Sequence, residues 1–226
     1  MLSVVVLDTI PSLTQPEFDS LLQLVQVEKQ ARIKRFRFLR DAHNCLLGDV
    51  LARAEICRIA GLSNEQLVFS ANAHGKPCLT NNPGIHFNIS HSGHYVACAT
   101  SDEPVGVDVE VFKPIDLALA VRFFTPNEVA YIRSGDQTCR FFEVWTKKES
   151  RIKREGKGLS MPLPSFDVLQ EEGQESFFYH KVFQNSEAMC HVCSGESSSP
   201  SLRVIDTSFF AKDGKSYCKQ GVFGIE

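Results

Sequence analysis

The chain has 226 residues, of which 43% are hydrophobic and 23% charged, and its formal net charge is −3. These values are ordinary for a globular protein, and at about 150 residues per domain the length allows one large domain or two small ones. The slightly negative charge excludes a generally basic nucleic-acid-binding protein. No stretch reaches the roughly 18 apolar residues of a membrane span, and the first residues lack the basic region of a signal peptide, so we expect a cytoplasmic protein without a membrane partner.

The first hundred residues contain predicted helices and strands. An apolar run over residues 2–8 predicts a buried strand, and a capping box at residues 14–17 predicts a helix to about residue 25. A basic stretch follows over residues 28–40, with Ile33, Phe36 and Leu39 at helical spacing. A longer helix is expected over residues 41–60. Three strands are expected after it, over residues 67–70, 86–89 and 95–100.

The second half begins with the clearest strand pattern in the chain, a strict alternation of apolar and polar residues over 105–112. A second capping box at 125–128 and a strongly helical segment over 138–155 predict two helices. Short strands are expected over residues 166–170, 176–182, 188–193, 201–206 and 216–222. Helices and strands mix without regular alternation, which predicts an α+β fold.

Eight cysteines are spread over the chain, mostly in apolar stretches, where a free thiol behaves as a small hydrophobic side chain. The one close pair, Cys190 and Cys193, forms a lone C-x-x-C motif, whereas a structural zinc site needs a second pair of ligands. We therefore expect reduced, structural cysteines.

Two carboxylates mark the strand at 105–112. Because strand side chains alternate, Asp108 and Glu110 share one face about 7 Å apart, and the valines between them point to the other face. Such oxygen ligands suit Mg²⁺, which readily shares phosphate oxygens with a substrate. The alternative is an edge strand with a solvated acidic face, and the alternation by itself favours that alternative.

The predicted helix at 138–155 carries the segment W-T-K-K-E-S-R-I-K. Glu149 and Lys153 share a face at i, i+4 spacing and can form an ordinary ion pair. Trp145 and Ile152 bury part of that face, so the Glu149 carboxylate needs a metal ion or a lysine to neutralise it. With the two strand carboxylates it makes three acidic ligands beside Lys148 and Lys153, a set suited to stabilising a transferred or departing phosphate.

Two turn segments supply weaker signals. The Gly-Lys-Pro segment at 75–77 contains Lys76, and the segment at 87–93 contains Ser90 and His91. At turns, these side chains are suited to receiving a phosphate or a ribose. A lone Ser-His pair is more often a turn than a catalytic dyad, and no acidic residue is placed to complete a triad.

Together these motifs resemble the 4′-phosphopantetheinyl transferases, specifically the larger surfactin-type branch that activates peptide and polyketide synthetases. The resemblance rests on the G-x-D-x-E motif at 106–110 and the W-x-x-K-E-x-x-x-K motif at 145–153, followed by G-K-G-L at 156–159. Supporting segments in the family's order lie at residues 41–43, 47–49, 75–77, 87–92 and 123–125. The resemblance runs from about residue 28 to 165.

The resemblance implies that the phosphopantetheine arm of coenzyme A moves to a serine of an apo carrier protein, peptidyl or acyl, and that adenosine 3′,5′-bisphosphate leaves. It implies that Mg²⁺ is held by Asp108, Glu110 and Glu149. Lys148 and Lys153 match positions that contact the phosphates, and Lys153 is expected to stabilise or protonate the leaving oxygen.

The contacts implied for the 3′-phosphate and nucleoside of coenzyme A fall on Lys29, Arg32, Lys76, Ser90 and His91. Glu128 matches a family position for the base that activates the incoming serine, but it is also the third residue of a capping box, so both roles stay open. Glu149 is the rival base. Cys45 stands where the family has threonine, and because a thiol is a weak donor we leave it out of the site.

The implied fold is a pseudo-dimer of two similar α+β halves, residues 1–104 and 105–226, with coenzyme A in the cleft between them. The first half supplies the nucleoside and 3′-phosphate contacts, and the second half supplies the metal ligands and catalytic groups. By the same resemblance one chain acts as a monomer. The resemblance fades after about residue 168, and residues 208–226 match nothing that we can place.

Three rival interpretations remain at this level. The carboxylates would also serve a Mg²⁺-dependent phosphohydrolase or nuclease, and the chain would also suit a carrier-binding module without chemistry. The basic stretch at 28–40 resembles a nucleic-acid patch, but its expected buried face and the negative net charge favour a solvated helix that meets coenzyme A phosphate. Part of this surface is also suited to steering acidic carrier proteins.

Overall fold

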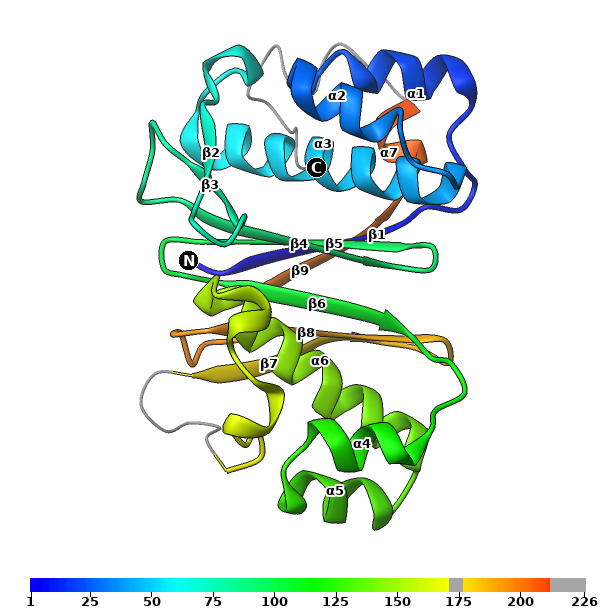
Figure 1. Cartoon of the computed structure of the whole chain (residues 1–226). Helices are drawn as coiled ribbons and strands as arrows, with labels where there is room; N and C mark the ends of the chain where they lie inside the picture. The colour runs from blue at the N-terminus through cyan, green and yellow to red at the C-terminus, as the bar shows by residue number, and fades with distance from the viewer. Residues whose placement is uncertain (171–176, 212–226) are drawn as a thin grey trace.

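The computed structural model describes residues 1–170 and 177–211, and four layers are stacked in it. A group of helices, two β-sheets and a second group of helices follow one another (Figure 1). This mixture of helices and mainly antiparallel sheets confirms the predicted α+β fold. In the described part of the chain, no helix is both long enough and apolar enough to cross a membrane.

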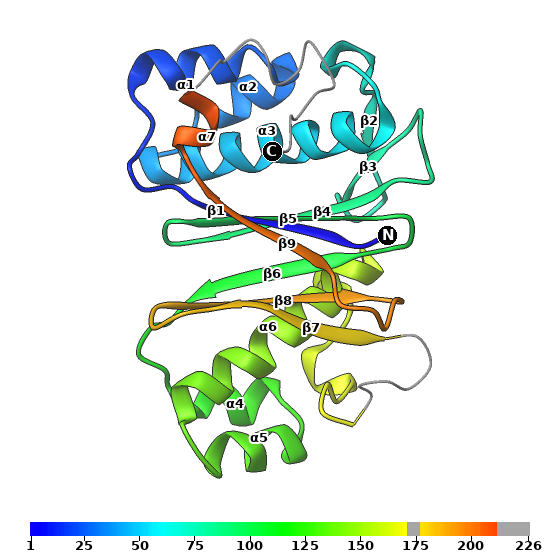
Figure 2. The same cartoon turned by 180° about the vertical axis from the view of Figure 1, so that it is seen from behind.

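The first sheet has the strand order β4-β5-β1-β9. Its strands are β1 (Ser3–Asp8), β4 (His86–Ser92), β5 (Tyr95–Ser101) and β9 (Ser201–Asp206). The first three pair antiparallel, whereas β9 pairs parallel with β1 and runs beside it (Figure 2). The last described strand therefore returns to the sheet that contains the first.

One face of this sheet is covered by the N-terminal helices. The elements of this region are α1 (Gln15–Leu22), α2 (Val27–Ile33), α3 (Leu39–Ala60), the short helix η1 (Asn64–Gln66), the hairpin β2 (Phe69–Ala71) and β3 (Pro77–Leu79), and α7 (Ser208–Ala211). The expected helical run over 28–40 is wrong in part, because α2 ends at Ile33 and the chain turns before α3. Leu39, expected on a buried face, is therefore 65% exposed.

The second sheet has the order β6-β8-β7, and α6 packs on it (Figure 1). The elements of this region are β6 (Gly106–Val111), α4 (Leu117–Phe123), α5 (Pro126–Arg133), α6 (Gln137–Glu155), the short helices η2 (Gly158–Ser160) and η3 (Leu163–Ser165), β7 (Phe178–Gln184) and β8 (Ala188–Ser194). The Gly156 residue, with φ of 66°, ends α6 in the left-handed conformation that glycine adopts readily.

The apolar run of β1 is explained by burial on both faces. Val4 and Val6 lie in the core between the two sheets, and Val5 and Leu7 lie in the core beneath α3. A strand covered on both faces has no polar alternation, which is why residues 2–8 are continuously hydrophobic.

The alternation of β6 separates a core face from a polar face. Val107 and Val109 are fully buried in the core between the sheets, so Asp108 points the other way, toward α6. Gly106 begins the strand where α6 passes closest, since a Cβ atom there would lie 2.0 Å from the Ser150 carbonyl oxygen. The absence of a side chain at this position lets β6 and α6 approach.

The strand expected over 166–170 is wrong. Backbone groups there bind side chains instead of a neighbouring strand: the Val168 N–H donates to Glu128 at 2.9 Å, and the Phe166 carbonyl accepts from Lys148 at 2.6 Å. The helix α4 and the strand β3 were not expected, and the strand expected over 216–222 lies outside the described residues.

The seven cysteines in the described residues carry free thiols. Cys190 and Cys193 lie on opposite faces of β8, one in the core between the sheets and the other in the core beneath α6. The C-x-x-C spacing therefore does not bring these two thiols together.

Candidate active site

The two sheets meet where β4, an edge strand of the first, runs beside β6, an edge strand of the second. Every second side chain of β4 in the stretch 88–92 accepts a hydrogen bond from a β6 backbone N–H. The pairs are Asn88 with Val107 at 2.9 Å, Ser90 with Val109 at 3.3 Å and Ser92 with Val111 at 3.2 Å. Side chains thus take the place of a backbone ladder between the sheets.

The polar face of β6 points at α6. Ser90 donates to Asp108 Oδ1 at 2.9 Å, and Ser92 donates to Glu110 Oε2 at 2.6 Å. From α6, Lys153 places its Nζ 2.6 Å from Asp108 Oδ1 and 2.8 Å from Ser90 Oγ. A carboxylate, a hydroxyl and an ammonium therefore form one network across both sheets and α6.

A cavity of about 330 Å³ lies over this network. Its lining residues are Ile89, Ser90, His91, Asp108, Glu110, Trp145, Glu149 and Lys153. The structure thus brings together in one cavity all three expected metal ligands and three of the expected coenzyme A contacts.

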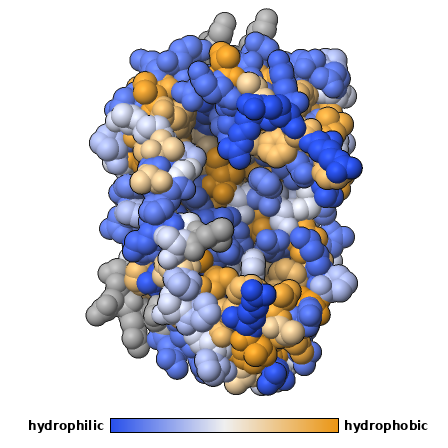
Figure 3. All heavy atoms as spheres, in the orientation of Figure 1, coloured by the Kyte–Doolittle hydropathy of each residue, from blue (hydrophilic) through white to orange (hydrophobic). Residues whose placement is uncertain are grey.

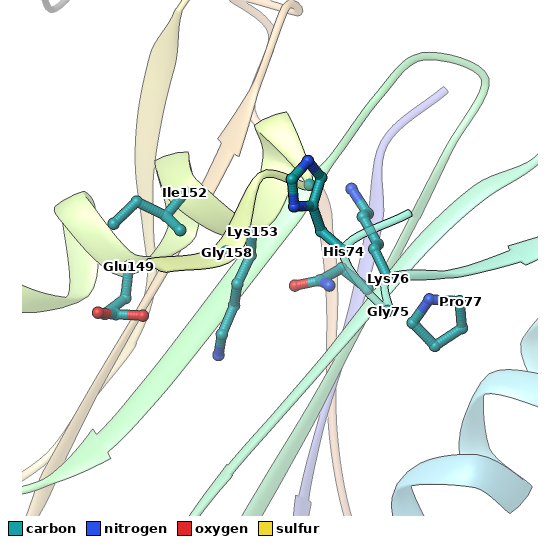
Figure 4. Close-up of a pocket in the computed structure, with 10 residues that line it drawn as sticks. His74, Gly75, Lys76, Pro77, Glu149, Ile152, Lys153 and Gly158 are labelled. Carbon is teal, nitrogen blue, oxygen red and sulfur yellow. The ribbon is translucent and has the colours of Figure 1, made fainter. Parts of the chain in front are cut away.

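An adjoining cavity of about 260 Å³ shares Glu149 and Lys153 with the first. Figure 4 shows these two residues extending from α6 on one side, while Gly75, Lys76 and Pro77 form the other side. The loop between β2 and β3 therefore faces the C-terminal turns of α6 across the cavity.

The basic residues of α2 line two further cavities of about 280 and 180 Å³. Lys29 and Arg32 border both, and His91 borders the smaller one as well as the acidic cavity. Lys29 Nζ lies 3.4 Å from Asp49 Oδ2. In the space-filling view this face is hollowed, with apolar surface deep in the hollow and hydrophilic side chains around it (Figure 3).

Burial dominates the electrostatics of the acidic cavity. It raises the pKa of Asp108, Glu110 and Glu149, and the charge of Asp108 raises the pKa of the other two further. Lys153 opposes this effect at all three carboxylates. Burial, and then the charge of Lys153, lower the pKa of His91. One buried and two half-buried acids beside Lys153 form a site that an added cation would stabilise.

The side-chain oxygens of Asp108, Glu110 and Glu149 are chemically suited to binding a magnesium ion. They are hard carboxylate oxygens, and Asp108 Oδ2 is buried with no hydrogen-bond partner among the described residues. Within residues 1–170 and 177–211, however, no three His, Cys, Asp or Glu side chains are already arranged around a common metal position. Lys153 is the cation that contacts Asp108 in this structure.

Lys148 and Glu128 are not brought to the cavity. Neither side chain is exposed, and the Lys148 Nζ lies 2.9 Å from Glu128 Oε2 and donates to the carbonyls of Leu163 and Phe166. Glu128 also closes the capping box of α5 with Thr125. This placement keeps both side chains away from the cavity and puts Glu128 in its capping position, while the phosphate contact of Lys148 stays a prediction.

Lys76 lines the second cavity, but its ammonium group points at the chain itself. Its Nζ donates to the carbonyls of Val105 and Arg154, both at 3.0 Å, and burial lowers the pKa of Lys76 to about 8. Next to it, Asn72 donates to the Gly156 carbonyl at 2.9 Å. We call Asn72 and Lys76 the hairpin clasp, because they hold the β2–β3 loop against the end of α6.

Three residues of the site were missed from the sequence. Asn88 and Ser92 share the face of Ser90 on one strand, and the period of two in residues 88–92 was a signal that would have grouped them. No sequence pattern points to Asn72, because Gly156, whose carbonyl accepts its hydrogen bond, is 84 positions away.

Carboxylates and a lysine line one cavity, and basic side chains line the cavities beside it, a combination that is chemically suited to a phosphate-bearing substrate. Residues 11–103 match the family described as "4′-phosphopantetheinyl transferase, N-terminal", and residues 104–213 match the "4′-phosphopantetheinyl transferase superfamily".

Curated relatives agree with these matches. The chain is 48% identical to 4′-phosphopantetheinyl transferase ffp of Bacillus subtilis over 168 residues, 73% of this chain and 75% of the relative. It is 45% identical to 4′-phosphopantetheinyl transferase Sfp of Bacillus subtilis strain 168 over 184 residues, 80% of each chain. It is 45% identical to 4′-phosphopantetheinyl transferase psf-1 of Bacillus pumilus over 162 residues, 70% of each. The chain belongs to the 4′-phosphopantetheinyl transferases, in their Sfp-like branch.

Proposed function

We propose that this transferase uses Mg²⁺ to move the 4′-phosphopantetheine group of coenzyme A to a serine of an apo carrier protein, releasing adenosine 3′,5′-bisphosphate. The observation that carries the proposal is the single cavity lined by Asp108, Glu110 and Glu149 beside Lys153. Carboxylates that are buried, like Asp108, or half-buried, like Glu110 and Glu149, are costly unless a cation balances them.

Mg²⁺ would be held by Asp108, Glu110 and Glu149, and when bound it would neutralise charge on the pyrophosphate of coenzyme A. The assignment is supported by Asp108 Oδ2, which is buried and has no hydrogen-bond partner in the part of the chain that the structure describes. Lys153 lies beside the same carboxylate and is free to turn from Asp108 toward an incoming phosphate, because its side chain is 26% exposed.

In the transfer step, the carrier serine oxygen bonds to the phosphorus that bears pantetheine, and the bond from that phosphorus to the bisphosphate oxygen breaks. Glu149 accepts the serine proton, a role that it would share with metal binding. Lys153 stabilises the negative charge on the leaving oxygen or protonates it. Glu128 takes no part, because it is buried against Lys148.

Coenzyme A would place its nucleoside and 3′-phosphate near Lys29, Arg32, Ser90 and His91. These residues line the acidic cavity or the cavities that adjoin it. A terminal phosphate carries nearly two negative charges, so a group of cations is the suitable surroundings.

We also infer that residues 1–104 and 105–226 are the two halves of a pseudo-dimer with coenzyme A between them. In support, each half packs one long helix, α3 or α6, on a sheet, although β9 joins the sheet of the first half. Residues from both halves line the same cavities, so one chain supplies a whole site and would act as a monomer. A transfer rate per enzyme that stays constant on dilution would support the monomer.

The proposed partners are peptidyl and acyl carrier domains, including those of peptide synthetases that make antibiotics, and the proposed location is the cytoplasm. The resemblance to the surfactin-type branch supports the partners. The free thiols support a reducing compartment.

The test is a transfer assay read by mass, in which the enzyme, coenzyme A and Mg²⁺ are incubated with a panel of apo carriers. We expect carriers to gain phosphopantetheine, and we expect chelation of Mg²⁺ to stop the gain. Asp108→Asn keeps the shape of the side chain but removes its charge, so the rate should fall about 100-fold or more.

Each rival predicts a different result in this assay. Cleavage of coenzyme A by water with an unmodified carrier would identify a phosphohydrolase. Carrier binding without any chemistry, unchanged by Asp108→Asn, would identify a binding module. Full activity in the presence of a chelator would contradict the proposed metal dependence alone.

A further inference from the structure

The serines of β4 contact β6 in two ways at once. Ser90 and Ser92 each accept a backbone N–H of β6 and each donate to a carboxylate of the same strand, Asp108 or Glu110. Asn88 accepts a backbone N–H in the same way but faces Gly106, which has no side chain. The junction between the sheets thus holds the carboxylates as well as the strands.

The direction of the two hydrogen bonds at Ser92 is determined by chemistry. The Val111 N–H can only donate, so the Ser92 oxygen accepts it at 3.2 Å. An ionised carboxylate can only accept, so the one hydroxyl proton goes to Glu110 Oε2 at 2.6 Å. Ser92 is 7% exposed, which leaves water little access to replace it.

Other restraints on the Glu110 carboxylate are weak by comparison. Lys113 Nζ lies 4.0 Å from Glu110 Oε2, and the Lys113 side chain is 66% exposed. Ser92, in contrast, is held in a strand and followed by Gly93, where an added Cβ would lie 2.5 Å from a methyl group of Val111. The turn therefore packs directly on β6 and leaves Ser92 little room to move.

We propose that Ser92 is a positioning residue for the metal site, which holds one oxygen of Glu110 and so presets this carboxylate for Mg²⁺. The inference rests on the proposed function, because it assumes that Glu110 is a metal ligand. A residue that orients a ligand through a hydrogen bond usually changes metal affinity by about 10- to 100-fold when it is removed.

The test titrates Mg²⁺ into the protein at saturating coenzyme A, with calorimetry and the shift in Tm as readouts. We expect Ser92→Ala to bind Mg²⁺ about tenfold or more weakly. Ser92→Thr restores a hydroxyl and should bind within about threefold of the wild-type protein. In a Glu110→Ala background, Ser92→Ala should cause no further loss of Mg²⁺ affinity, since the carboxylate that it positions is gone.

Asn88→Ala is the matched control, because it removes a hydrogen bond from the same junction without touching a carboxylate. Asn88 lines the adjoining cavities, and saturating coenzyme A keeps any loss of coenzyme A affinity out of the comparison. It should lower Tm as Ser92→Ala does and leave Mg²⁺ affinity within about threefold of the wild type. Equal weakening of Mg²⁺ binding by both variants would overturn the inference, because general loosening of the junction would then explain it.

Unchanged Mg²⁺ binding in Ser92→Ala would also overturn the inference while leaving the proposed function intact. If the wild-type protein itself shows no Mg²⁺ binding, the proposed metal site fails, and the role of Ser92 fails with it. Should Ser92→Ala not fold, Ser92→Cys takes its place in the same comparison, because a thiol keeps the approximate shape but is a poor donor.

Discussion

At the scale of single residues, Lys148 and Glu128 form an ion pair with neither side chain exposed. Removing two charges from water is costly, and here the cost is offset by the carbonyls of Leu163 and Phe166 on the lysine and by the N–H groups of Thr125 and Val168 on the carboxylate. The pair fastens the 163–168 segment to α5 and α6.

We expect Glu128→Gln to lower the free energy of unfolding by about 3 kcal/mol, because it replaces the carboxylate 2.9 Å from the buried Lys148 ammonium with a neutral amide. The kcat of transfer, measured well below Tm, should change less than about threefold. Urea denaturation and the transfer assay check the two values.

Glu149→Gln is the matched control, since it should lower kcat strongly at a small cost in stability. The opposite pattern, a large loss of kcat in Glu128→Gln with unchanged unfolding, would restore Glu128 as the base.

At the scale of elements, α6 connects the site to the second sheet through His191 of β8. Thr146 Oγ1 donates a hydrogen bond to the Phe142 carbonyl at 2.6 Å and lies 2.8 Å from His191 Nδ1. Because the hydroxyl has only one proton, the His191 ring is the donor in the second contact, from Nδ1. Its Nε2 has no hydrogen-bond partner among the described residues. Burial holds the pKa of His191 well below the ordinary 6.5, so the folded protein keeps the ring neutral.

Acid should therefore destabilise the fold through this residue. As pH falls below 6.5, the unfolded chain takes up a proton at His191 that the folded chain does not, and stability falls with pH. We expect His191→Gln to remove up to about 1.4 kcal/mol per pH unit of this slope between pH 6.5 and 5. Urea denaturation at several pH values in that range measures the slope, and His74→Ala, a substitution of an exposed histidine, is the control. Equal slopes in the wild type and His191→Gln would contradict the prediction.

The other end of α6 is held by the hairpin clasp of Asn72 and Lys76. Because the Lys76 ammonium binds two backbone carbonyls, we expect Lys76→Met to loosen the β2–β3 loop and raise the KM for coenzyme A about 3- to 10-fold, with kcat nearly unchanged. Steady-state kinetics with varied coenzyme A checks this.

Asn72→Ala removes the other hydrogen bond of the hairpin clasp, which involves no charge, and should also raise the KM for coenzyme A. If only Lys76→Met raises KM, the lysine contacts a coenzyme A phosphate directly, and the clasp is not the reason.

At the scale of the whole molecule, β9 carries the chain back from the second sheet to the first. Its Arg203 pairs with Glu55 of α3, a carboxylate that is 1% exposed and also lies 3.0 Å from Arg58. This pair joins a late strand to an early helix and so fastens β9 to the helices that cover the first sheet.

We expect Arg203→Ala to lower the free energy of unfolding by about 1–2 kcal/mol, less than for a fully buried pair because the arginine is 37% exposed. Urea denaturation measures the loss, and Arg203→Lys should recover part of it. No change in Arg203→Ala would show that Arg58 is a sufficient partner for Glu55.

Local patterns predicted much of this fold. Caps and periodicity located α3, α5 and α6 to within a few residues, because these signals depend on neighbours three or four positions apart. The failed strand at 166–170 shows the limit. Phe166 and Val168 are buried, but the side chains of Lys148 and Glu128 form hydrogen bonds with their backbone groups. A local sequence pattern does not reveal a hydrogen-bond partner that lies so far away in the chain.

The sequence by itself determined the family, the two motif-bearing elements and the set of carboxylates and cations, since spacing on one strand and one helix decides which side chains share a face. Only the tertiary structure decided which of them meet. It placed Lys153 on Asp108, buried Lys148 against Glu128, turned Lys76 toward backbone carbonyls, and set the serines of β4 on the carboxylates of β6. The physical reason is that the charged and hydrogen-bonding partners lie at least 18 positions apart, and as many as 45 for Lys153 and Asp108. A local sequence pattern relates only residues a few positions apart.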